Sequence, residues 1–451
     1  MIKQIKSLLY FPIANYFKFF AQIRLSIWNP KIIVVTGSSG KTTLLNLIES
    51  QLQDKAKYSH FANSSYGIPF DILGLRRTNL TFDEWPYLFL AAPFKAFKKP
   101  PQEKLYIVEA DCDRPHEGKF LADLLKPEVT LWTGVGRTHS MNFDNLVKEK
   151  ECHCKEERRS NSIQKRLPHQ SADWFAMTQN GRKKTTFKVE QAIAYEFGYF
   201  LEATKHLAIV NGDSELINNQ LKRTKAKIQT VNQKELDYYK VFKDHTEFKI
   251  NGKTYSINAL LPKEVSLSIQ MTLSLLEYLK IKPDYSFSKF ILPSGRCSLF
   301  QGIKNTTIID SSYNATPDGV KAILNMFSLY PSQNKWLVLG DMTELGNKEQ
   351  EDHKKLADLI NSMKLNKIIL VGPRLRKYAS VDIKNKTQTF LMPKDALDYL
   401  IQNLQSEETI LFKGARFLEG IIEHLLIDKN DVNKLCRREL VWQERRKKWG
   451  L

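Results

Sequence analysis

The sequence predicts an α/β protein with two successive domains, each built on a mostly parallel sheet covered by helices. Short β-branched runs alternate with apolar-periodic stretches along both halves of the chain, which is the pattern of parallel strands with helices on both faces. A glycine-rich loop also lies between one such run and the helix after it. At 451 residues the chain is long enough for two or three domains with cores of their own.

The first predicted domain covers residues 30–291. Its β-branched run at 31–35 is followed by a glycine-rich turn and a helical pattern from Thr42 to Leu52, which predicts strand, turn and helix. Further buried strands are predicted at 105–110, 129–133 and 207–211. Residues 150–187 lack a clear period and are interpreted as an insert.

A second series of strands and helices predicts another domain over 292–433. It is preceded by an alternating stretch around Asn251-Gly252, a strong hairpin signal, and by a helical pattern over 263–279. The strands of this second series are predicted at 307–310, 336–339, 367–371 and 409–412.

Both ends of the chain are basic. The net charge is +19, and most of it lies in residues 1–29, in the insert and in a tail at 434–451. Basic appendages on a nearly balanced body favour an acidic surface as partner over a nucleic-acid groove. The aromatic, acid-free segment 1–29 predicts a helix that either lies in a membrane interface or packs on the protein's own core.

The five cysteines are odd in number and scattered, and no signal peptide is recognised, which favours a reducing cytoplasm. No run approaches the length needed to cross a bilayer. Cys152 and Cys154, with His153 and His169, allow a zinc site or a loop that happens to hold two thiols, because one C-x-C pair is a weak signal.

The loop between the first strand and helix carries the clearest chemistry. It reads TGSSGKTT over 36–43, so its glycines let the backbone wrap a phosphate chain at a helix N-terminus. Lys41 can meet the β- and γ-phosphates, and the Thr42 hydroxyl can ligate magnesium. Val35 stands where the first glycine of the general phosphate-loop pattern would be.

This loop resembles that of the Mur ligase family, and further motifs follow in the family's order. They are Asn63-Ser64-Ser65-Tyr66-Gly67-Ile68-Pro69, Glu109-Ala110-Asp111 with Asp113-Arg114-Pro115, His139, Asn211-Gly212-Asp213, Ser294-Gly295-Arg296, Asp310 to Pro317, Gly340 to Gly346, His353, and Lys413-Gly414-Ala415-Arg416. The motif Met342-Thr343-Glu344-Leu345-Gly346 is most similar to the branch that adds D-alanyl-D-alanine. The resemblance covers about residues 31 to 427.

The resemblance implies a central P-loop ATPase domain followed by a Rossmann-like α/β domain, with ATP and Mg²⁺ as cofactors. It implies Lys41, Glu109 and His139 as catalytic residues, and Thr42, Glu109 and His139 as metal ligands. Taken singly, Glu109 could be a structural ion-pair partner and His139 a core histidine, but their positions after two separate strands favour ligand roles. The implied ATP contacts are Gly37, Ser38, Ser39, Gly40, Lys41, Thr42, Thr43, Asn211, Arg296, Asp310 and Asn314, and the implied substrate contacts are Asn63, Ser64, Lys413 and Arg416.

The chain departs from the family in two places. The phosphate loop begins at Thr36, which leaves no room in this sequence for the separate UDP-sugar domain that family members carry before it. The helix most similar to the one with the family's carbamylated lysine has Phe197 at that position, while Lys150 lies closer to His139.

The function predicted from the resemblance is ATP-dependent joining of a carboxylate to an amine through an acyl-phosphate. The expected substrates are a carboxylate-bearing cell-wall precursor and an amino acid or dipeptide. The expected location is the cytoplasm, with peripheral membrane contact and no nucleic-acid partner. The alternatives are another amide ligase of the superfamily, similar to folylpolyglutamate or cyanophycin synthetase, and a non-catalytic ATP-binding paralogue.

Overall fold

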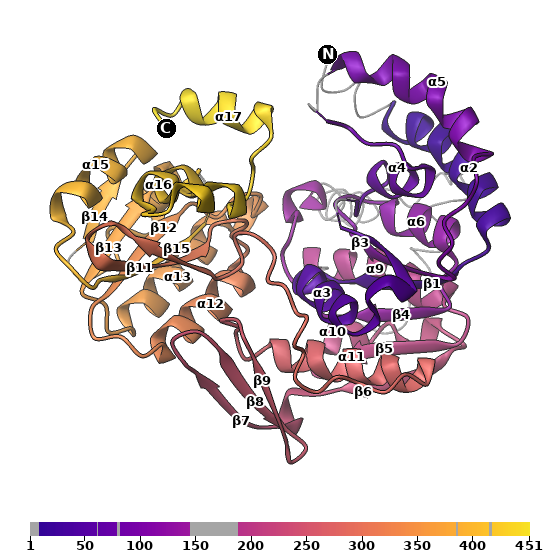
Figure 1. Cartoon of the computed structure of the whole chain (residues 1–451), viewed down its shortest axis with the longest axis horizontal. Helices are drawn as coiled ribbons and strands as arrows, with labels where there is room; N and C mark the ends of the chain where they lie inside the picture. The colour runs from indigo at the N-terminus through magenta and orange to yellow at the C-terminus, as the bar shows by residue number, and fades with distance from the viewer. Residues whose placement is uncertain (1–8, 61, 79–81, 145–187, 385–386, 415–416) are drawn as a thin grey trace, which may run out of the picture.

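The computed structural model describes residues 9–60, 62–78, 82–144, 188–384, 387–414 and 417–451. They form two α/β bodies with a small antiparallel sheet beside the connection between them (Figure 1). The predicted insert falls entirely outside these ranges, and so do Lys150, Cys152, His153, Cys154, His169 and Arg416.

The first body is a six-stranded sheet in the order β2-β3-β1-β4-β5-β6, with every neighbouring pair parallel. Its strands are β1 Lys31–Thr36, β2 Ala56–Ser59, β3 Leu105–Ala110, β4 Val129–Trp132, β5 Leu207–Asn211 and β6 Lys227–Val231. Its helices are α2 Tyr10–Trp28, α3 Lys41–Leu52, α4 Gly67–Leu73, α5 Trp85–Ala96, α6 Glu117–Leu125, α9 Val189–Ala203, α10 Glu215–Asn218 and α11 Val265–Leu279. Alternate residues of β1 face opposite sides, so Ile33 and Val35 pack with α3 and α11, while Val34 packs with α2 and α6.

The second body repeats this architecture in the order β10-β11-β15-β12-β13-β14, with only β10 antiparallel. Its strands are β10 Ser298–Gly302, β11 Thr306–Ser311, β12 Lys335–Gly340, β13 Lys367–Val371, β14 Thr387–Phe390 and β15 Thr409–Lys413. Its helices are α12 Pro317–Leu329, α13 Glu349–Asn361, α14 Pro373–Tyr378, α15 Pro393–Asn403, α16 Leu418–Leu425 and α17 Leu440–Lys447. The predicted fold class, two α/β domains with mostly parallel sheets, is confirmed.

The hairpin predicted at Asn251-Gly252 joins strands β8 Thr246–Ile250 and β9 Lys253–Ile257. Both turn residues have positive φ, 48° and 76°, as a two-residue hairpin turn requires. Strand β7 Leu236–Val241 completes this three-stranded antiparallel sheet.

Helix α2 packs on the first body. Of the two alternatives for the N-terminal segment, a membrane interface or the protein's own core, the structure has the second. Pro12 lies in its first turn, where its missing N–H costs no helical hydrogen bond. Ala14, Phe17, Ala21 and Trp28 are buried, and the Phe17 ring lies 4.7 Å from that of Phe70. No helix within the described ranges is long and apolar enough to cross a bilayer.

The C-terminal tail is also tied to the core. Arg446 is buried, and its guanidinium lies 3.8 Å from the carboxylate of fully buried Glu419. Arg437 reaches the same carboxylate at 3.4 Å, and Arg438 pairs with Glu423 at 2.6 Å. Three cations of the basic tail therefore stabilise the second body.

We predict that Phe17→Ala lowers the free energy of unfolding by about 3–5 kcal/mol, because it empties a buried aromatic site. Phe19→Ala on the same helix is the matched control, since Phe19 is 58% exposed, and it should change stability by less than about 0.5 kcal/mol. Urea unfolding followed by tryptophan fluorescence measures both. Equal effects of the two changes would contradict the packing role of α2.

Candidate active site

The phosphate loop is shaped by two glycines between β1 and α3. Gly37 has φ of 126°, and a Cβ there would lie 2.4 Å from the Thr133 hydroxyl, so a side chain is excluded. Gly40 has φ of 81° at the N-cap of α3. The Ser38 amide donates to the Gly134 carbonyl at 2.9 Å, which holds the loop against the segment after β4. The result is a backbone cradle at a helix N-terminus, the arrangement that binds phosphate.

Lys41 is buried at the first position of α3. Its Nζ lies 2.7 Å from Asp111 Oδ2 and donates to the Gly37 carbonyl at 2.6 Å. Burial alone would lower the pKa of Lys41, but Asp111 and Glu109 outweigh it and the net shift is upward. The ammonium is therefore a fixed positive charge under the phosphate loop.

The Thr42 hydroxyl joins the two bodies. It donates to Glu109 Oε2 at 2.9 Å and accepts from Arg296 Nη2, also at 2.9 Å. Glu109 lies on β3 and Arg296 follows the connection to the second body. Two of the predicted metal ligands, Thr42 and Glu109, are thus in contact.

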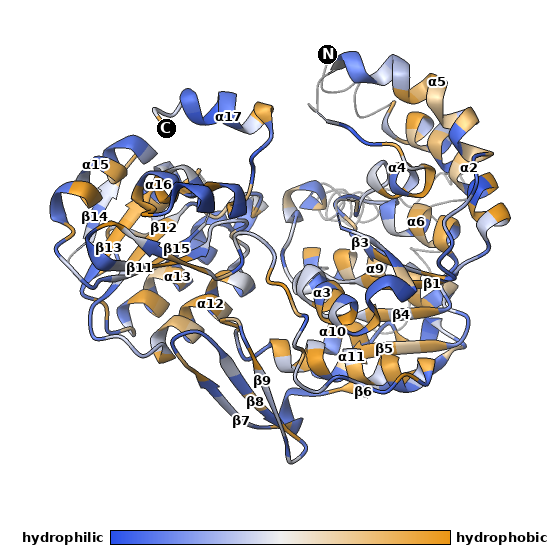
Figure 2. Ribbon diagram, in the orientation of Figure 1, coloured by the Kyte–Doolittle hydropathy of each residue, from blue (hydrophilic) through white to orange (hydrophobic). Residues whose placement is uncertain are grey.

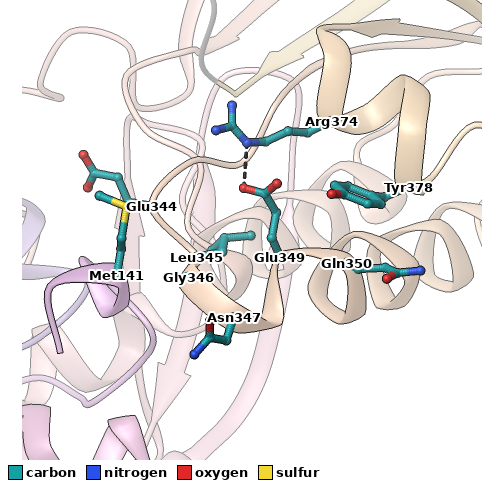
Figure 3. A pocket seen from close by; sticks show the side chains of 9 residues that line it. All are labelled: Met141, Glu344, Leu345, Gly346, Asn347, Glu349, Gln350, Arg374 and Tyr378. Atoms are coloured by element: carbon teal, nitrogen blue, oxygen red, sulfur yellow. Dashed lines mark hydrogen bonds and ion pairs between the residues drawn. The ribbon is translucent and has the colours of Figure 1, made fainter. Parts of the chain in front are cut away.

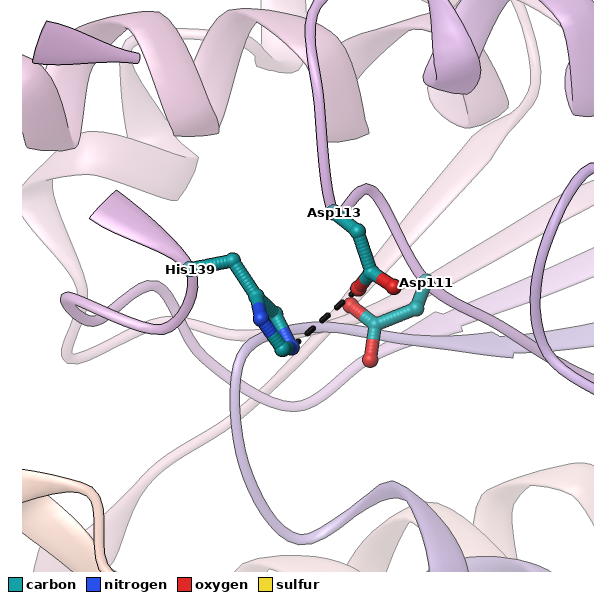
Figure 4. Close-up of side chains that lie close together, drawn as sticks. All are labelled: Asp111, Asp113 and His139. Carbon is teal, nitrogen blue, oxygen red and sulfur yellow. Dashed lines mark ion pairs between the residues drawn. The ribbon is translucent and has the colours of Figure 1, made fainter. Parts of the chain in front are cut away.

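The third predicted ligand, His139, lies in a different group. Its Nε2 is 3.2 Å from Asp113 Oδ1 and its Nδ1 is 2.6 Å from Glu344 Oε2. Figure 4 shows His139 and Asp113 facing each other beside Asp111. Among the described residues, these three can each offer a ligand atom within 4.8 Å of the others.

These side chains fit a divalent cation. Asp113 Oδ1 is buried and, apart from its ion pair with His139, makes no hydrogen bond. The two carboxylates supply the hard oxygen ligands that magnesium prefers, and the imidazole adds a softer nitrogen ligand. Burial and neighbouring Asp111 raise the pKa of Asp113 to about 7, although His139 opposes the shift. Burial alone would lower the pKa of His139, but Glu344, Asp113 and Asp111 raise it to about 9. The acidic cluster therefore attracts positive charge.

Arg137 makes a second link between the bodies. It donates to the Leu345 carbonyl at 2.9 Å, pairs with Glu190 at 3.0 Å and lies 3.6 Å from Asp352. The Asn347 amide donates to Asp144 at 3.1 Å. These contacts place the loop after β12 against the loop after β4.

The predicted nucleotide and substrate residues of the second body lie near the same junction. Asp310 is fully buried; its Oδ1 accepts the Ser312 amide at 2.9 Å, and its Oδ2 has no hydrogen-bond partner. Buried Lys413 donates to the Asn314 carbonyl. Arg296 stacks over the Tyr313 ring at 4.7 Å.

The remaining predicted residues of the first body surround the phosphate loop. Asn211, at the end of β5, donates to the Thr133 carbonyl at 3.1 Å, and the Thr133 hydroxyl donates to Ser39 at 2.6 Å. The Asn63 carbonyl accepts the amide of Asp111 at 2.8 Å. The Ser64 hydroxyl accepts the Gly67 amide at 3.2 Å, at the start of α4. Phe197 is buried against Trp132, with ring centroids 5.9 Å apart, and so fills core space.

Reasoning from the sequence missed the roles of Asp111, Asp113 and Glu344. Asp111 and Asp113 stood beside Glu109 in the quoted motif, and their spacing of two, directly after a strand, was a usable signal. The pairing of Glu344 with His139 had no local signal, because it joins residues 205 positions apart.

An open cavity of about 350 Å³ lies beside His139, between the bodies. Its walls are Met141, Glu344, Leu345, Gly346, Asn347, Glu349, Gln350, Arg374 and Tyr378 (Figure 3). Arg374 pairs with Glu349 at 2.7 Å. The wall therefore offers one guanidinium and two carboxylates to a small zwitterion.

A family model and individual known proteins both show similarity of this chain to Mur ligases. Residues 295–416 match the family described as Mur ligase, glutamate ligase domain. The UDP-N-acetylmuramoyl-tripeptide–D-alanyl-D-alanine ligase of Bacillus subtilis is 23% identical over 413 residues, covering 88% of this chain and 76% of that protein.

Two solved structures have a similar fold. MurF ligase from Thermotoga maritima in complex with ADP superposes with a TM-score of 0.68 and 18% identity, covering 93% of this chain and 84% of that one. Folylpolyglutamate synthase of Mycobacterium tuberculosis, complexed with ADP and AMPPCP, gives 0.54 and 11%, covering 90% and 94%.

We predict a pH-dependent contribution of Lys413 to stability. Burial lowers the pKa of Lys413 to about 8, whereas an unfolded lysine titrates near pH 10.4, so the unfolded chain binds more protons between these values. The contribution of Lys413 to the free energy of unfolding therefore rises as the pH increases from about 8 to about 10, by up to about 1.4 kcal/mol per pH unit.

Urea unfolding at several pH values, compared between wild type and Lys413→Met, measures this contribution. The variant should lack the rise. Lys364→Met, at an exposed lysine of the same body, should retain it. An unchanged pH profile in Lys413→Met would contradict the assignment.

Proposed function

We propose that this relative of the Mur ligases is an ATP-dependent ligase that joins a carboxylate to an amine through an acyl-phosphate in the synthesis of a cell-wall precursor. The proposal is supported by the order of its motifs and by the curated relative that covers most of the chain. A single geometric observation carries it: the Thr42 hydroxyl on the phosphate loop contacts Glu109 of the first body and Arg296 from the start of the second.

This contact suits a reaction on ATP held between two bodies. The γ-phosphoryl group leaves the ADP oxygen and bonds to a carboxylate oxygen of the substrate, so two anions must approach each other. Lys41, Arg296 and the backbone amides of the loop offset that repulsion. Magnesium, which we place at Thr42 with Glu109 and near Asp111, Asp113 and His139, supplies further positive charge to the phosphate oxygens when bound.

The second half of the reaction forms the amide. The uncharged amine of the acceptor attacks the carbonyl carbon of the acyl-phosphate, and the phosphate leaves with one of the original carboxylate oxygens. The products are the amide, ADP, phosphate and a proton. Closure of the two bodies, through the Arg137 and His139 contacts, would exclude water from the acyl-phosphate.

The cavity beside His139 is our proposed acceptor site. An amino acid or dipeptide is a zwitterion, and Arg374 can hold its carboxylate while Glu344 or Glu349 holds its ammonium. Asn63, Ser64, Lys413 and Arg416 remain proposed contacts of the carboxylate substrate. We place the reaction in the cytoplasm, with peripheral contact at the inner face of the membrane.

We predict that Lys41→Ala abolishes acceptor-dependent ADP release, because it removes the ammonium that lies beside Asp111 under the phosphate loop. Lys55→Ala, an exposed lysine just beyond the same helix, is the control and should keep wild-type activity. ADP release is measured with precursor and acceptor pairs, after circular dichroism shows that both variants are folded.

Undiminished turnover in Lys41→Ala would refute the site. Absence of acceptor-stimulated ADP release in the wild type, despite ATP binding, would assign the chain to the non-catalytic alternative. Stimulation by glutamate and not by dipeptides would assign it to the folylpolyglutamate-like alternative.

We predict that Arg374→Ala raises the KM for the acceptor by about tenfold to a hundredfold, because it removes one charge-assisted contact. The KM for ATP should change little. Arg376→Ala lies on the same helix and is exposed, so it should leave both values unchanged. An unaltered acceptor KM in Arg374→Ala would exclude the cavity as the acceptor site.

A further inference from the structure

Helix α5 exposes an apolar stripe to solvent. Tyr87, Leu90, Phe94 and Phe97, which we call the α5 stripe, are 61 to 80% exposed. Their spacing of three, four and three residues places them on one face of a helix. The opposite face, with Leu88, Ala92 and Ala96, is buried in the core. A surface helix normally turns polar residues outward, so this outer face is unusual; Figure 2 shows α5 as a ribbon with several hydrophobic residues along it.

The stripe is presented by a firmly held helix. Pro93 cannot donate to the Phe89 carbonyl four residues earlier, and the Tyr16 hydroxyl of α2 donates to that carbonyl instead, at 2.8 Å. Buried Arg24, also on α2, donates to the carbonyls of Lys95, Lys98 and Lys99 at 2.7, 2.7 and 3.1 Å. The orientation of the stripe is therefore fixed by specific hydrogen bonds to α2.

The charged residues within helices α2 and α5, and in the segment just after α5, are all cations. Neither residues 10–28 nor residues 85–102 contain an acidic residue. Lys98 and Lys99 are exposed next to the end of the stripe, and Lys95 is partly exposed. Asp83 and Glu84 lie just before α5, and Glu103 lies after the lysines. Between these acids, aromatic and aliphatic side chains beside lysines complement a surface with an apolar layer below anionic headgroups.

We propose that the outer face of α5 docks on an anionic lipid bilayer, with the α5 stripe entering the interface and the lysines contacting headgroups. The proposal concerns a surface outside the ATP site, and it does not depend on the ligase activity. It differs from the contact expected of the basic ends, because it uses α5 and the lysines after it, whereas α2 packs on the core and Arg437, Arg438 and Arg446 pair with glutamates of the second body. Docking would hold the active site at a membrane, where a lipid-linked carboxylate substrate could reach it.

Co-sedimentation with vesicles tests the proposal on the full chain. The vesicles are phosphatidylcholine alone or mixed with phosphatidylglycerol, at about 50 mM and about 500 mM salt, where the screening lengths differ several-fold. We expect binding to the mixed vesicles that weakens at high salt. Leu90→Ser/Phe94→Ser should reduce binding at least about tenfold, because it removes two inserted side chains.

Two further variants sharpen the test. Lys98→Glu/Lys99→Glu keeps the stripe and should remove the preference for phosphatidylglycerol. Leu329→Ser/Val381→Ser changes two exposed apolar residues of the second body and should bind as wild type. ADP release in vesicle-free solution should be the same in all variants, which separates failure of docking from failure of the ligase proposal.

Three outcomes would overturn the proposal. They are no binding by the wild type, equal binding by Leu90→Ser/Phe94→Ser, and equal loss in the Leu329→Ser/Val381→Ser control. Sedimentation velocity without vesicles adds a fourth, since a dimer lost in Leu90→Ser/Phe94→Ser would assign the stripe to a second copy of the chain.

Discussion

The parallel register of β1 and β3 brings the phosphate loop to the acidic residues that follow β3. Val35 pairs with Glu109 and Thr36 with Ala110, so both strands end at the same level. The chain after β1 then turns into α3, and Lys41 meets Asp111 while Thr42 meets Glu109. A buried ammonium without these carboxylates would be costly. The cation for the phosphates and the candidate ligands for a metal are therefore positioned by one strand pairing.

The polar contacts that tie the loop after β12 to the first body come from side chains and carbonyls of loop residues. His139 and Glu344 both have left-handed backbone conformations, with φ of 55° and 63°, which cost energy for residues with a Cβ. Their side chains meet at 2.6 Å between the bodies. Arg137 adds contacts to Leu345 and Asp352. Because polar contacts dominate these links, the arrangement is compatible with opening and closing around substrates.

The fold could be predicted from the sequence where a local pattern determined it. The strands at 105–110, 207–211 and 367–371 have the predicted bounds, since uninterrupted apolar runs between polar residues define buried parallel strands. Strand β2 was missed because only four residues pair at the sheet edge, and two of them are lysine and serine. The same holds for the site. The phosphate loop could be predicted because it is one contiguous motif, whereas the His139–Glu344 pair could not, because it depends on how the two bodies pack together.

The basic ends of the chain show that several of their cations also have partners inside the fold. Arg24 binds three backbone carbonyls, and Arg437 and Arg446 surround buried Glu419. A guanidinium carries five donors in a planar fork, so it can join separate backbone segments as readily as it can contact an anionic surface. For α5, the sequence does not tell which side is buried, because its apolar residues occur on every face of the helix. Only packing distinguishes the buried face from the α5 stripe, so exposed apolar area is a better guide to a docking surface here than net charge.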